Sequence, residues 1–137
     1  MQYWMLKSEP SAYSWEKLLA DKRTSWTGVR NHQAANNLKA MKRGDRGFFY
    51  HSNEGLAIVG VVEILREAYP DPGDASGRFV AVDVGPLMAA KTPVALTAIK
   101  ATKALVELAL VRQSRLSVSP VTAKEWAVLT KMAGVEA

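Results

Sequence analysis

The sequence predicts an α+β domain in which a small mixed β-barrel or curled sheet carries helices at its rim. Two observations predict this class. Five short segments have the composition of strands, and helical segments interrupt them along the chain. The 137 residues, 48% of them hydrophobic, are enough for one core and too few for two. Because no internal repeat divides the chain, we expect a single domain over residues 1–137.

The expected strands are rich in aromatic or β-branched residues. Residues 56–65 are almost wholly apolar, which is typical of a strand buried on both faces. Residues 79–84 alternate between two faces, as a half-buried strand does. The full set of expected strands is 3–6, 47–51, 56–65, 79–84 and 115–118, the last ended by Pro120. Residues 69–77 are rich in proline, glycine and aspartate and predict a loop.

Cap residues mark the expected helices. Residues 31–41 carry apolar side chains at helical spacing and begin at Asn31, a good N-cap. A Thr-x-x-Glu capping box that starts at Thr122 predicts a further helix near the C-terminus. A short helix capped by Ser14 and a helical segment over 97–105 complete the set.

Several classes of protein are disfavoured by composition. The longest apolar run is far shorter than the roughly 20 residues that span a bilayer, and the strand-like start leaves no room for a signal peptide. The chain has no cysteine, and His32 and His51 lack the spacing of metal ligands. We therefore expect a cytoplasmic protein, or a nuclear one in a eukaryote, without a membrane partner, metal or cofactor.

The residues that could support catalysis are few. The candidate nucleophiles are Ser8, beside Glu9, and Ser52, beside His51. Neighbours in a strand point to opposite faces, so His51 is badly placed to activate Ser52. No nucleophile elbow or glycine-rich phosphate loop is present. We expect a non-catalytic protein, and a base-modifying enzyme that uses His51 or Ser52 is one alternative.

Positive charge is concentrated in one part of the chain. The net charge is +5, and residues 21–46 account for all of it, whereas residues 54–83 are acidic. Concentrated positive charge suits phosphate binding, because neutralised phosphates release counterions. A solvated basic face that binds nothing explains the charge equally well. The candidate phosphate-binding residues are Lys22, Arg23, Lys39, Lys42, Arg43 and Arg46.

A tryptophan followed by a polar cluster is the strongest sign of a binding site. Between Trp26 and Gln33 the chain combines an aromatic ring, a flexible glycine, and arginine and amide side chains at a helix start. These groups can stack on an extruded base and read its edge. A Trp26 buried in the core and an Asn31 that only caps the helix are the competing interpretation. Residues 48–53 also mix aromatic and polar groups, although a strand-end histidine is more often structural.

The order of these motifs resembles the EVE domain family over nearly the whole chain. The runs that carry the resemblance are Tyr3 to Pro10, Trp26 to Gln33, Gly44 to Asn53, Glu67 to Asp71, Val82 to Val84, Ser114 to Val121 and the Thr-x-x-Glu-Trp helix start. The resemblance implies a PUA-like fold of about five to six strands, related to the ASCH and YTH domains. It also implies a monomeric, non-catalytic reader of a modified base in DNA or RNA.

The resemblance further implies an aromatic-lined pocket for that base. Carried over onto this chain, the pocket residues are Trp26, Arg30, Asn31, Gln33, Lys7, Ser8, Tyr50, His51, Ser52, Arg115 and Ser117. Two departures from the family pattern concern contacts with the nucleic-acid backbone. The family often has a long, charged loop after the Tyr-Pro-Asp motif, whereas here only residues 72–78 connect it to the next strand. Ala35 stands where the family commonly has an arginine. A pocket for a free small anionic metabolite or nucleotide is the other alternative.

Overall fold

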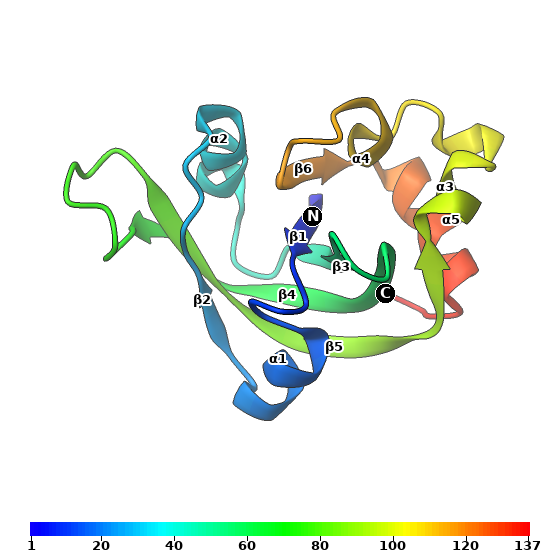
Figure 1. The fold of residues 1–137 in the computed structure, drawn as a ribbon, viewed down its shortest axis with the longest axis horizontal. Coiled ribbons are helices and arrows are strands. Elements are labelled where there is room, and N and C mark those ends of the chain that lie inside the picture. Colours follow the sequence, from blue (N-terminus) through cyan, green and yellow to red (C-terminus); the bar gives the residue numbers. More distant parts are fainter.

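The computed structural model describes residues 1–137, which form an α+β fold with one six-stranded mixed sheet and helices packed on it (Figure 1). The strands are β1 (Tyr3–Ser8), β2 (Thr24–Trp26), β3 (Arg46–His51), β4 (Ala57–Pro70), β5 (Val80–Ala95) and β6 (Val118–Val121). The helices are α1 (Trp15–Asp21), α2 (His32–Ala40), α3 (Leu96–Lys100), α4 (Ala109–Arg112) and α5 (Ala123–Ala133), with a 3-10 turn, η1 (Lys103–Leu105). No helix is long and apolar enough to cross a bilayer.

The strands follow the order β2-β5-β4-β3-β1-β6. All neighbours are antiparallel except β1 and β3, which run parallel. The order ends at β2 and β6, and no pairing closes it into the expected barrel. The parallel register sets Ser8 opposite His51, so two polar runs that lie far apart in the sequence end side by side.

The sheet separates two apolar cores. The first core contains Trp4 and Leu6 from β1 together with residues of α1 and α2. The second core contains Met5 from β1 together with residues of α3, α4 and α5. This division follows from the alternation of side chains along a strand, which also sends Phe49 to the first core and Phe48 to the second.

The structure differs from the expected elements at several places, and the short helix α4 was not predicted. Strand β2 was not predicted, because three residues are too few to show a period. The last strand covers 118–121 rather than 115–118 and runs through Pro120, which an edge strand tolerates because it has a side without hydrogen bonds. Strands β4 and β5 extend well beyond their predicted ends, and their register shifts at several bulges. The segment 97–105 forms α3 and η1 rather than one helix.

Candidate functional site

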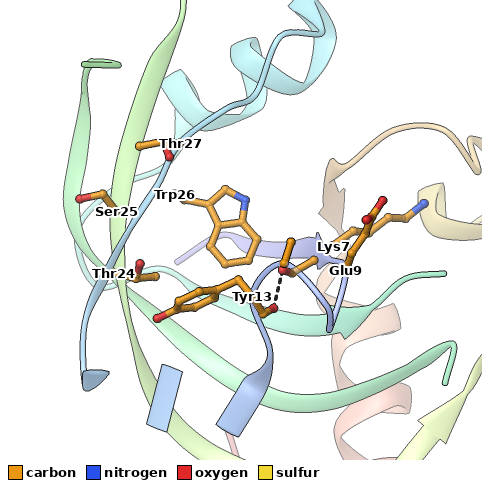
Figure 2. Close-up of a pocket in the computed structure, with 9 residues that line it drawn as sticks. Lys7, Glu9, Tyr13, Thr24, Ser25, Trp26 and Thr27 are labelled. Atoms are coloured by element: carbon orange, nitrogen blue, oxygen red, sulfur yellow. Dashed lines mark hydrogen bonds between the residues drawn. The ribbon is translucent and has the colours of Figure 1, made fainter. Parts of the chain in front are cut away.

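The first pocket lies where the end of β1, the segment before α1, and β2 come together (Figure 2). We call it the Trp26 pocket. It has a volume of about 390 Å³, within the range of small-molecule sites. Its lining residues are Lys7, Ser8, Glu9, Ala12, Tyr13, Thr24, Ser25, Trp26 and Thr27. Hydroxyl groups dominate the polar lining, and one ammonium and one carboxylate stand at the end of β1.

Trp26 belongs both to this pocket and to the first core. Only 9% of its surface is exposed, and its ring packs edge-to-face against Phe49 with centroids 5.6 Å apart. Pairing of β2 with β5 sets Trp26 opposite Val82, which is also in the core. The two interpretations of this residue are therefore compatible, because the core holds the indole in place while the pocket is built beside it (Figure 2).

Tyr13 supplies the second aromatic ring of the pocket. Its hydroxyl donates to Asp21 Oδ2 at 2.9 Å, and its backbone carbonyl accepts from Ser8 Oγ at 2.6 Å. Burial raises the pKa of the Tyr13 phenol, which keeps it neutral. The sequence did not predict Tyr13 as a pocket residue, because it lies in an irregular segment where no periodicity marks a partly buried ring. Its closeness to the Lys-Ser-Glu-Pro run was the only available signal.

Asp71 fixes the chain that follows Trp26. Its buried carboxylate accepts from the Gly28 N–H at 2.8 Å, from Arg30 Nη1 at 2.9 Å and from the Gly73 N–H at 2.8 Å. Burial alone would raise the pKa of the Asp71 carboxyl, but these donors outweigh it and the pKa is lowered. Gly28 has φ +80, a backbone conformation that suits glycine. Arg30 is thus committed to Asp71, outside the lining of the Trp26 pocket.

The Tyr-His-Ser run at the end of β3 divides between the two faces of the sheet. Tyr50 is 2% exposed and lies in the second core, so the expectation that it contacts the pocket is corrected by the alternation of β3. His51 Nε2 accepts from the Trp15 N–H at 3.1 Å and so holds the start of α1. The Ser52 N–H donates to the Ser8 carbonyl at 2.9 Å. His51 and Ser52 thus bind residues next to or within the pocket lining but do not line the pocket themselves.

Three of the expected base contacts line a separate pocket, which we call the Arg115 pocket. It has a volume of about 380 Å³. Its lining residues are Asn31, Gln33, Arg112, Gln113, Ser114, Arg115 and Leu116. Asn31 caps α2 by accepting from the Ala34 N–H at 2.9 Å. Arg112 was not predicted from the sequence, because it lies outside the motifs that carry the resemblance.

Lys7 joins the two pockets. It lines the Trp26 pocket, and its ammonium donates to the carbonyl of Ser114 in the Arg115 pocket at 2.6 Å. Its backbone N–H donates to the Ser117 carbonyl at 3.0 Å, which is how Ser117 contributes here. Burial lowers the pKa of the Lys7 ammonium. In Figure 2 the Lys7 side chain points away from Trp26.

The basic residues expected to bind phosphate do not form one surface around the Trp26 pocket. Lys22 and Arg23 directly precede β2, and Arg23 pairs with Asp83 at 3.0 Å. Arg46 lies opposite Tyr3, at the end of β1 that is far from the pocket. Lys42 and Arg43 lie at the same end, beside Met1 and Gln2. At about 3.3 Å per residue, β1 separates the two ends by about 17 Å. Lys39 lies in the last turn of α2. Phosphate binding by these residues stays a prediction.

Comparison with known proteins gives consistent matches. The family model described as the EVE domain matches residues 2–132. Thymocyte nuclear protein 1 of Gallus gallus is 39% identical over 158 residues, covering 90% of this chain and 65% of that protein. The human protein of the same name is 46% identical over 81 residues, 50% of this chain and 36% of its own length. The chain therefore spans less than two thirds of these relatives.

Solved structures share the fold. A protein from Rhodopseudomonas palustris is 55% identical, with a TM-score of 0.94, and the match covers 100% of this chain and 97% of that one. Human THYN1, solved in complex with DNA containing 5-methylcytosine, is 31% identical with a TM-score of 0.92 and complete coverage of both chains. A YTH domain of Zygosaccharomyces rouxii, solved with N6-methyladenosine RNA, is 15% identical with a TM-score of 0.62 over 96% of this chain and 86% of that one, a likeness of fold alone.

Proposed function

Since the chain belongs to the EVE domain family, we propose that it is a non-catalytic reader that holds a modified base of a nucleic acid in the Trp26 pocket. The observation that carries the proposal is the pairing of this aromatic-lined, hydroxyl-rich pocket with a full-length structural match to human THYN1 bound to DNA containing 5-methylcytosine. DNA with 5-methylcytosine is therefore the first ligand to test. A monomeric state and a cytoplasmic location are parts of the same proposal.

The chemistry of the Trp26 pocket suits a neutral base better than an anion. Trp26 is held rigidly and can stack on a base, and hydroxyl groups can both donate to and accept from a base edge. Glu9 could accept from the exocyclic amine of a cytosine. A free anionic metabolite would meet this carboxylate, while the Lys7 ammonium is already bonded to the Ser114 carbonyl.

The groups that an enzyme would need are engaged in structural hydrogen bonds. Ser8 Oγ donates to the Tyr13 carbonyl, and the Nε2 of His51 accepts from the Trp15 N–H. A nucleophile and a general base must instead lie within hydrogen-bond reach of each other. This arrangement supports the non-catalytic proposal.

The test is to measure polarisation of labelled duplexes that differ only in one 5-methylcytosine or cytosine, with single-stranded RNA carrying N6-methyladenosine in parallel. We expect preference for a modified base. Trp26→Ala, measured in the fraction that stays folded, should weaken binding of the preferred oligonucleotide by the stacking free energy of about 1–3 kcal/mol, roughly 5- to 150-fold in Kd, and so reduce the preference. Trp26→Phe, which keeps a stacking face, is the matched control. Equal affinity of the parent for all modified and plain oligonucleotides would overturn the proposal.

A further inference from the structure

The Arg115 pocket has the chemistry of an anion site and differs from the Trp26 pocket in this respect. Two guanidinium groups, three side-chain amides and a hydroxyl line it, with Leu116 as its one hydrophobic residue and no carboxylate. Arg115 is exposed and makes no ion pair. Arg112 pairs only with exposed Glu107 at 3.3 Å. Such a surface ion pair contributes little to stability, so a ligand can replace Glu107 as the partner of Arg112. Both cations are therefore available to a ligand.

The polar groups of this pocket come from two segments far apart in the sequence. Asn31 and Gln33 lie at the start of α2, which has no acidic residue in its first turn. The N-terminal end of a nine-residue helix adds a positive potential that favours an anion. Arg112 to Leu116 face this helix start across the pocket. Guanidinium groups hold phosphate oxygens with paired, planar hydrogen bonds, which makes phosphate the fitting anion.

The two pockets are neighbours on one surface. Lys7 lines the Trp26 pocket, and its ammonium bonds to Ser114 in the Arg115 pocket. On the other side, Thr27 lines one pocket and Asn31 the other. Four residues of chain span at most about 14 Å. This separation is one that adjacent groups of a single nucleic-acid strand can bridge.

We propose that the Arg115 pocket binds the backbone phosphate adjacent to the base held in the Trp26 pocket, with Arg112 and Arg115 as its ligands. Lys7 is the shared edge over which the strand passes. The proposal rests on the proposed function and divides the site that the sequence suggested as one: Trp26 faces the base, whereas Asn31, Gln33 and Arg115 face the phosphate. Phosphate contacts position a strand but carry no base information.

The test uses the double variant Arg112→Gln/Arg115→Gln with duplex DNA carrying 5-methylcytosine or cytosine. We expect at least a tenfold loss of affinity for both duplexes and an unchanged ratio of their Kd values. The slope of log K against log salt should fall by about one, because the contact that neutralises one backbone phosphate is lost. The matched control is Lys124→Gln/Lys131→Gln, which removes the same charge from exposed positions of α5 and should change Kd by less than twofold.

Three outcomes separate this proposal from the one on which it rests. If the parent prefers 5-methylcytosine and the arginine double variant binds like the α5 control, the phosphate site is wrong and the reader function stands. If the double variant loses the preference but keeps its salt slope, the Arg115 pocket reads the base, which also overturns the proposal. If the parent shows no preference for any modified base, the proposed function fails and this inference fails with it.

Discussion

The two cores on either side of the sheet are nearly equal in size, but their tryptophan side chains are packed differently. The first core has 16 buried residues and the second has 14. In the second core Trp126 is stacked on both sides, against Phe48 at 4.1 Å and Tyr3 at 4.4 Å, and its indole N–H donates to the Ala137 carbonyl. In the first core Trp26 has no stacked partner and meets Phe49 only edge-to-face.

This difference fits the position of Trp26 at the edge of a pocket. An aromatic ring with both faces covered contributes packing energy and leaves nothing for a ligand. Trp26 is also buried, yet it has a pocket beside it. Polar anchors such as Asp71 and His51 hold the segments around that pocket, whereas stacked rings cover Trp126 in the second core. Changes on the two sides should therefore have separable effects.

The largest expected effect is on stability and comes from the second core. Trp126→Ala should lower the free energy of unfolding by about 3–5 kcal/mol, because it removes a buried ring and leaves a cavity. Urea denaturation measures this loss. The preference for a modified base, measured by polarisation in the fraction that stays folded, should not change. Trp126→Phe is the control, because it keeps an aromatic ring between Tyr3 and Phe48. If Trp126→Ala lost as much preference for the modified base as Trp26→Ala, the two sides of the sheet would not have separable effects.

An intermediate effect should follow from Asp71→Asn, which changes the carboxylate that holds the segment after Trp26. The buried carboxylate holds Gly28, Gly73 and Arg30, and an amide leaves at least one donor unmatched. We expect a loss of about 1–3 kcal/mol in stability together with a weaker preference for the modified base. Denaturation and polarisation are measured on the same sample. Arg30→Lys, which retains a cation for Asp71, should be milder in both, and a stability loss without any change in preference would show that Asp71 does not position Trp26.

Sequence patterns predicted the parts of this molecule that depend on local periodicity. The alternation of residues 79–84 and the capping box at Thr122 identified elements that the structure confirms. Trp26 stood out because an aromatic beside a polar cluster is uncommon, and the structure places it at a pocket. The EVE family assignment from ordered motifs is also confirmed.

What could not be predicted depends on contacts between distant segments. Lys7 and Ser114 are separated by 107 positions, and only their hydrogen bond reveals that two pockets share an edge. Tyr13 lines the Trp26 pocket from an irregular segment whose position is set by Ser8. Tyr50 was assigned to the pocket through its motif, although β3 turns it to the opposite core. A motif identifies which residues lie near a site, but the pairing of strands decides which side each one faces.

The smallest expected effect is a pH dependence that originates at His51. Its Nε2 must be unprotonated to accept the Trp15 N–H, and burial lowers the pKa of this imidazole, with nearby Glu16 acting in the opposite direction. The unfolded chain, with an ordinary pKa of 6.5, therefore takes up its proton at a higher pH than the folded chain. Stability from this source is complete above pH 6.5 and falls as the pH drops below it.

Urea midpoints at a series of pH values, compared between the parent and His51→Gln, measure this effect. The variant's side-chain carbonyl can still accept from the Trp15 N–H but does not titrate, so its stability should fall less on acidification. His32→Gln is the matched control, since His32 is exposed, and it should keep the acid loss of the parent. An equal acid loss in His51→Gln would place the titrating group elsewhere. A reduced loss would show that the first core depends on a polar, titratable anchor at His51.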